Sequence, residues 1–134
     1  MVVFDSSYLI IRYDESLEAI TEEWKLDFTQ TVQEDKFRQP LEKLLEEFSN
    51  KKAKKWLCDN TEQKTLLAKD QLWLENYFYP QLFKRGLKAA ALVNAKHILG
   101  TGYAKNCLQN VDDEILQIEV FNKNKEAREW LKKA

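Results

Sequence analysis

Polar side chains follow two apolar runs of the chain, at points where buried strands are expected to end. Asp59, Asn60 and Thr61 follow the first run, and Asn94 and His97 follow the second. Open parallel sheets bind their ligands beyond the carboxyl ends of the strands. These five residues are therefore candidate binding residues at one edge of a sheet. Asp, Asn and Thr also stabilise turns through their side chains, and this structural role is the favoured interpretation.

The triplet Gly100-Thr101-Gly102 supplies two further candidates, because it opens a predicted helix over residues 101–110. The free N–H groups at a helix N-terminus attract anions, so Thr101 and Gly102 are added to the candidate binding residues. The triplet is not a dinucleotide fingerprint, since the third glycine and the tight turn from a preceding strand are missing. Glycines at this point also permit a simple backbone bend.

Catalytic chemistry has little support in the sequence. His97 is the only histidine, so a metal site or a nucleophile–histidine pair would have to be centred on it. Zinc sites need three or four correctly spaced ligands, and the sequence offers no such spacing. We predict no metal and no cofactor. A hydrolase centred on His97 and Asp59 is the least favoured alternative.

The remaining reactive side chains are expected to be structural. Cys58 lies in an apolar run and Cys107 in a predicted helix, so both are expected to be buried free thiols. The neighbouring carboxylates Glu22 and Glu23 are expected to be solvated, as is the pair formed by residues 112 and 113.

Size and charge exclude several classes of protein. The chain has 134 residues, of which 44% are hydrophobic, so it is expected to form a single domain over residues 1–134. Its 21 basic side chains are balanced by 22 acidic ones, which argues against nucleic-acid binding. No apolar segment approaches the roughly 18 residues of a membrane span. With two cysteines and no signal peptide, a cytoplasmic location is expected.

Strands and helices alternate along most of the chain. Residues 7–13 and 17–28 predict an N-terminal β-hairpin, with a bulge near Ile20-Thr21 where the alternation of apolar residues slips. A capping box at Thr31-x-x-Glu34 predicts a helix, whose strongest part is expected to begin near Pro40.

The second half of the chain continues this pattern. Strands are predicted over residues 53–59, 87–94 and 115–121, and helices over 70–85, 101–110 and 124–133. Pro80 is expected to kink the first of these helices, and Gly86 to end it in a left-handed cap. The order predicts an α/β fold with a mixed, mostly parallel sheet, an N-terminal β-hairpin and about four helices.

That order, together with several short motifs, resembles a SpoIIAA-like branch of the bacterial STAS family. The motifs are Lys55-Trp56-Leu57-Cys58-Asp59-Asn60, Lys69-Asp70-Gln71-Leu72-Trp73, Tyr79-Pro80, Arg85-Gly86-Leu87 and Ala127-x-x-Trp130-Leu131. The resemblance extends over nearly the whole chain. It implies a non-enzymatic regulatory module that binds a protein partner through residues 59–61 and the helix near residues 100–110.

The phosphoregulated members of that family carry a Ser or Thr in an Asp-Ser-Gly-like turn. Here the corresponding residues are Asp59-Asn60-Thr61-Glu62. Because Asp59 and Glu62 would repel a phosphate on Thr61, the family's phosphorylation switch is not expected here.

Two further interactions are left open by the sequence. The aromatic and leucine side chains of residues 72–83 could line an apolar pocket, which makes a small-molecule or lipid carrier the alternative function. An open edge of the N-terminal hairpin could also pair with a second copy of the chain to form a homodimer.

Overall fold

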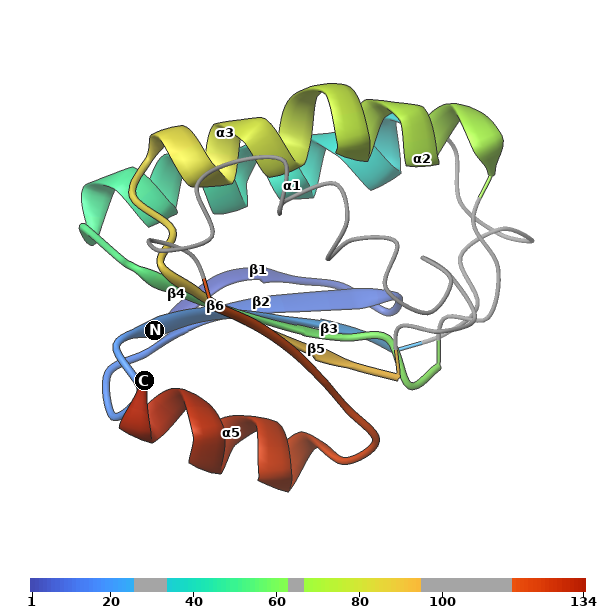
Figure 1. Cartoon of the computed structure of the whole chain (residues 1–134). Helices are drawn as coiled ribbons and strands as arrows, with labels where there is room; N and C mark the ends of the chain where they lie inside the picture. The colour runs from blue at the N-terminus through green and yellow to red at the C-terminus, as the bar shows by residue number, and fades with distance from the viewer. Residues whose placement is uncertain (26–33, 63–66, 95–116) are drawn as a thin grey trace.

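The computed structural model describes residues 1–25, 34–62, 67–94 and 117–134. Within these residues the chain forms one six-stranded mixed sheet with helices on both faces (Figure 1). The elements are β1 (Val2–Asp5), β2 (Leu9–Asp14), β3 (Ala19–Trp24), α1 (Glu34–Asn50), β4 (Lys55–Asp59), α2 (Ala68–Trp73), the π-helical segment η2 (Leu74–Phe78), α3 (Tyr79–Lys84), β5 (Ala89–Val93), β6 (Gln117–Phe121) and α5 (Asn124–Lys133).

The strands lie in the sheet in the same order as in the chain, from β1 to β6. Strands β1, β2 and β3 pair antiparallel, whereas β3, β4, β5 and β6 pair parallel. The predicted α/β fold, with an antiparallel N-terminal hairpin and a parallel remainder, is therefore confirmed. The sequence analysis missed β1, although its Val2-Val3-Phe4 run has strong β propensity.

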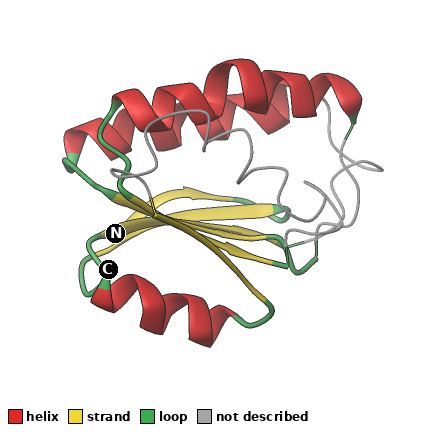
Figure 2. Cartoon of the chain, in the orientation of Figure 1, coloured by secondary structure: helices red, strands yellow, loops and turns green. Residues whose placement is uncertain are grey.

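Both faces of the central strands are covered, and every residue of β5 is buried. Figure 2 shows α1 and the α2–α3 helix on one face of the sheet and α5 on the other. Large side chains such as Phe48, Trp56 and Phe78 fill the first layer. The small residues of β5 pack with Ala127 and Leu131 of α5 in the second layer.

The bulge predicted in the second strand is absent. Residues Ala19 to Trp24 of β3 pair with β2 in one unbroken register, and the irregularity lies instead between Val2 and Phe4 of β1. Strand β3 is buried on both faces apart from Glu23. A strand covered on both sides need not alternate apolar and polar residues, which explains the misleading pattern.

Helix α1 begins at Glu34, well before Pro40, so the prediction that its strongest part begins near Pro40 is wrong. A proline inside a helix lacks the N–H that would bond the carbonyl four residues earlier, here that of Lys36. The Tyr8 hydroxyl donates a hydrogen bond to this carbonyl at 2.8 Å. A side chain from the β1–β2 connection thus supplies the missing donor. The capping residue Thr31 lies outside the described residues.

The helix predicted over residues 70–85 is present, but it is interrupted by η2 just before Pro80. There the N–H of Tyr79 bonds the carbonyl of Leu74, five residues back, so the expected irregularity takes the form of a π-helical turn. The predicted cap is confirmed. Gly86 has φ +106°, and the bonds from Gly86 N to Phe83 O and from Leu87 N to Leu82 O form a Schellman motif.

The C-terminal helix has the predicted bounds, and it buries Ala127 and Leu131. The helix predicted over residues 101–110, the third of the four in chain order, lies outside the described residues. In the described part of the chain, no helix is long and apolar enough to cross a membrane.

Candidate functional site

The carboxyl ends of β4 and β5 bring three of the predicted residues together. Asp59 accepts hydrogen bonds at Oδ1 from the backbone N–H of Thr61 (2.9 Å) and from the Thr61 hydroxyl. The same hydroxyl oxygen accepts a bond from Nδ2 of Asn94 (2.9 Å). Asn94 adopts φ +52°, a left-handed conformation that asparagine tolerates better than most residues. We call Asp59, Thr61 and Asn94 the edge cluster.

Helix α5 extends the edge cluster beneath the sheet. The other carboxylate oxygen of Asp59 accepts a bond from Asn124 at 2.8 Å. Arg128, one turn further along α5, donates to Asn124 Oδ1 at 2.6 Å and to Asp14 at 2.9 Å. Asp59 is only 7% exposed, and its carboxylate accepts three hydrogen bonds, two from Thr61 and one from Asn124. Hydrogen bonds therefore hold the edge cluster in place, and its central carboxylate, that of Asp59, is buried.

The other predicted binding residues are placed differently. Asn60 is buried, its backbone N–H continues the sheet by bonding Val93 O, and its side chain contacts Cys58. It lies beneath the surface at this edge of the sheet. His97, Thr101 and Gly102 lie outside the described residues, as does Cys107.

Glu22 is a second polar centre, and sequence reasoning missed it. Its carboxyl is 2% exposed rather than solvated, which corrects the expectation for the Glu22–Glu23 pair. Oε1 accepts a hydrogen bond from the indole N–H of Trp56 at 2.7 Å, and Oε2 accepts one from that of Trp24 at 2.9 Å. Cys58 is its pairing partner on the neighbouring strand β4.

Burial sets the protonation of this group. Loss of solvation raises the pKa of the Glu22 carboxyl from its ordinary 4.5 to about 7, against the opposing effect of the two indoles and the thiol. Burial, together with the Glu22 charge, holds the pKa of the Cys58 thiol well above its ordinary value. Cys58 is thus a buried thiol, as predicted, and a poor nucleophile.

The position of Glu22 could have been inferred from strand periodicity. Side chains two residues apart share a face of a strand, which places Ile20, Glu22 and Trp24 together toward α1. What the sequence could not supply was the second indole donor, because Trp56 comes from a different strand.

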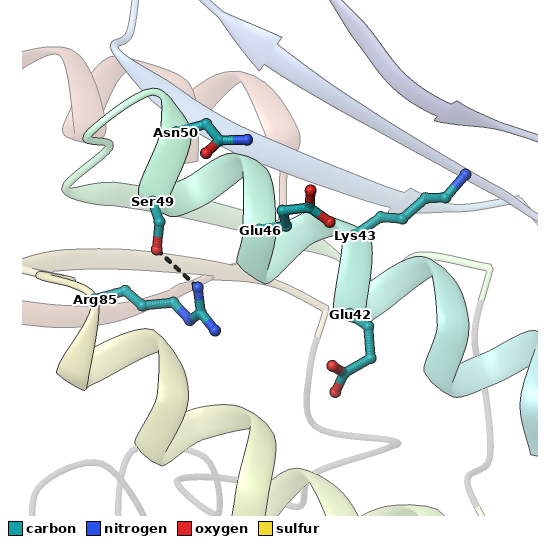
Figure 3. A pocket seen from close by; sticks show the side chains of 6 residues that line it. All are labelled: Glu42, Lys43, Glu46, Ser49, Asn50 and Arg85. Atoms are coloured by element: carbon teal, nitrogen blue, oxygen red, sulfur yellow. Dashed lines mark hydrogen bonds between the residues drawn. The ribbon is translucent and has the colours of Figure 1, made fainter.

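A separate hollow of about 380 Å³ lies between α1 and the end of α3 (Figure 3). Arg85 reaches across it and donates to Ser49 Oγ at 2.8 Å and to the carbonyl of Leu45 at 3.2 Å. Glu42, Glu46 and Lys43 line the rest together with Asn50. Charges of both signs are mixed in this hollow. Its position at the C-terminal half of α1 separates it from the edge cluster.

The apolar face of the α2–α3 helix packs onto the sheet. Phe78 and Tyr79 contact the Trp56 ring, with centroids 5.9 and 6.1 Å away, and Leu82 is fully buried. Leu72 points outward and is 55% exposed. Much of the surface that could have lined a carrier pocket is therefore occupied by packing within the protein, and the carrier function stays a prediction.

Comparison with protein-family models, with curated proteins and with solved structures finds no match to this chain. The function must therefore be argued from the geometry. Among the described residues, no group of three or more His, Cys, Asp or Glu side chains is placed to hold a metal ion.

Proposed function

We propose that this chain is a regulatory binding module of STAS type, which docks a protein partner against the edge cluster without catalysing a reaction. The observation that carries the proposal is the hydrogen-bonded arrangement of Asp59, Thr61 and Asn94 on two neighbouring strand ends. Thr61 is exposed and Asn94 is partly exposed, so a partner can reach both. Polar groups fixed in advance by a rigid scaffold lose little entropy on binding, which favours specific recognition.

Two features of the fold support the resemblance on which the STAS assignment rests. From β3 onward, strand order follows chain order, with α1 and the α2–α3 helix connecting successive parallel strands. The turn after β4 carries Thr61 of the edge cluster, at the position where the family has its regulatory turn. The Thr61 hydroxyl is engaged by both Asp59 and Asn94, in keeping with a structural and docking role for this residue.

The experiment is affinity capture from the source cells with the tagged full chain, followed by a binding titration with any partner recovered. Thr61→Val removes the hydroxyl, and Asn94→Gly removes the amide while keeping the left-handed backbone. Each variant should weaken binding about tenfold if the edge cluster is central to the interface. Lys88→Ala is the matched control, because Lys88 is exposed near the opposite end of β5. Equal binding by all four proteins would refute the docking site.

A further inference from the structure

Arg85, at the end of α3, contacts α1 through one nitrogen of its guanidinium. Nη1 donates to the carbonyl of Leu45 at 3.2 Å and to Ser49 Oγ at 2.8 Å, which anchors the side chain. Nε is buried and has no hydrogen-bond partner among the described residues. No ion pair in the described part of the chain involves Arg85. A buried donor without an acceptor costs free energy, so an acceptor that enters from outside the chain would be bound favourably.

The donors of Arg85 that α1 does not engage lie together on one edge of the guanidinium. The N–H of Nε is parallel to one N–H of Nη2 on the side away from Nη1. Two parallel N–H groups match the two oxygens of a carboxylate, which binds such an edge through both oxygens. Because Arg85 is partly exposed and lines the hollow between α1 and α3, a carboxylate that enters the hollow can meet this edge.

Glu42 of α1 lines the same hollow and carries the opposite charge. Figure 3 shows Glu42 and Arg85 pointing into the space between the two helices. The Tyr77 hydroxyl donates to Glu42 Oε2 at 3.1 Å, which holds the carboxylate in place, and Oε1 accepts no hydrogen bond from the described residues. Glu42 and Ser49, which anchors Arg85, are about two turns or about 10 Å apart along α1. The hollow thus has an anionic and a cationic group at separate positions.

We propose that this hollow binds a small zwitterion whose carboxylate and ammonium group are several bonds apart. The carboxylate lies on the Nε–Nη2 edge of Arg85, and the ammonium group donates to Oε1 of Glu42. Glu42 and Glu46 repel an anion that lacks the ammonium group, whereas Arg85 and Lys43 repel a cation that lacks the carboxylate. Ligand pockets have volumes of about 300–1,000 Å³, and a hollow of about 380 Å³ suits a small ligand.

The test is an NMR titration of the isotope-labelled full chain with γ-aminobutyrate and with glycylglycine, each at low ionic strength. The Nε–H signal of Arg85 should shift, together with the side-chain amide of Asn50, which also lines the hollow. At least one of the two ligands should bind with a dissociation constant of about 1 mM. Butyrate and butylamine carry only one of the two charges and should bind at least about tenfold more weakly. The side-chain amide of Asn124, on α5, is the internal control.

Variants of the two charged residues identify the groups that hold the ligand. Arg85→Lys keeps the positive charge but lacks the paired donors, so most of the binding should be lost. Glu42→Gln should weaken binding of the zwitterion and strengthen binding of butyrate. Glu129→Gln, which removes an exposed carboxylate from α5, is the matched control and should change neither. Butyrate that binds wild type as tightly as the zwitterions would refute the proposal, and so would no binding of either zwitterion at about 10 mM. These two outcomes are measured on wild type and do not depend on the folding of a variant.

Glu46 shows whether the protein itself occupies the edge of Arg85 in solution. In the ligand-free chain, Glu46→Gln should leave the Arg85 Nε–H signal nearly in place. If this variant shifted the signal as strongly as γ-aminobutyrate shifts it in wild type, an internal ion pair would fill the edge and the proposal would be wrong. The hollow is separate from the edge cluster, so that result would leave the docking function standing.

Discussion

The carboxyl of Glu22 is enclosed by two tryptophan indoles and a thiol, on the face of the sheet that α1 covers. Two N–H donors suit an ionised carboxylate, whereas burial favours the neutral acid. Burial prevails, which is why the pKa rises to about 7. A group at this position links protein stability to pH.

The direction in which stability changes with pH follows from the protonation of Glu22 in the folded and in the unfolded chain. Below pH 4.5 the carboxyl is neutral in both folded and unfolded chains; between 4.5 and about 7 only the unfolded chain releases the proton. The free energy of unfolding should therefore fall by about 3 kcal/mol as pH rises through this window, and then level off. Urea denaturation at a series of pH values measures it.

Glu22→Gln cannot ionise, so this variant should lose that part of the pH dependence, whatever its stability at low pH. Glu23→Gln is the matched control, because Glu23 is the adjacent, exposed carboxylate on the same strand. If wild type and Glu22→Gln lost stability in parallel from pH 5 to pH 8, the assignment of about 7 to Glu22 would be wrong.

Among the elements, helix α1 depends most visibly on a contact from outside itself. Pro40 interrupts its hydrogen bonding, and the hydroxyl of Tyr8 bonds the carbonyl of Lys36 left without its usual donor. The helix also buries Phe37, Leu41, Leu44, Leu45 and Phe48 against the sheet. The packing of these side chains and the hydrogen bond from Tyr8 together stabilise the helix around Pro40. Local propensity alone would place a proline at the start of a helix.

Tyr8→Phe should destabilise the protein by about 1 kcal/mol, because it removes the donor to the Lys36 carbonyl. In a Pro40→Ala background, a new backbone N–H at position 40 can bond that carbonyl, so the same change should cost clearly less. A double-mutant cycle by chemical denaturation measures the difference. Tyr77→Phe, which loses a bond to Glu42 instead, should cost the same in both backgrounds. Additive effects of Tyr8→Phe and Pro40→Ala would contradict this role of Tyr8.

In the molecule as a whole, the sheet is most protected at its centre. Strands β4 and β5 are paired on both sides, and nearly all of their residues are buried. Strand β1 is a short edge strand with a register shift, and Val2 is 55% exposed. A shift of this kind hinders pairing with a further strand, which bears on the predicted homodimer through this hairpin. That homodimer stays a prediction.

Native-state hydrogen exchange should reflect this difference in protection between the centre of the sheet and its edge. Amides of β4 and β5 should exchange only through global unfolding, whereas those of β1 should exchange faster through local opening. NMR detection of individual amides measures both rates. Equal protection of β1 and β5 would show that the edge is covered in solution, as a dimer through β1 would require.

Much of the fold was predictable because its signals are local. The continuous apolar run of β5, the bounds of α5 and the left-handed cap at Gly86 each depend on residues close together in the chain. Clustering at the carboxyl edge followed from parallel topology, which places the ends of β4 and β5 side by side.

The sequence by itself determined the alternation of strands and helices, the parallel half of the sheet and the convergence of Asp59, Thr61 and Asn94. Only the tertiary structure decided the burial of Glu22, the tolerance of Pro40 inside a helix and the unbroken register of β3. These depend on partners distant in the chain: the indole of Trp56, the hydroxyl of Tyr8 and the helices on both faces. A buried polar group takes its properties from whichever groups surround it, and those are fixed only when the layers pack.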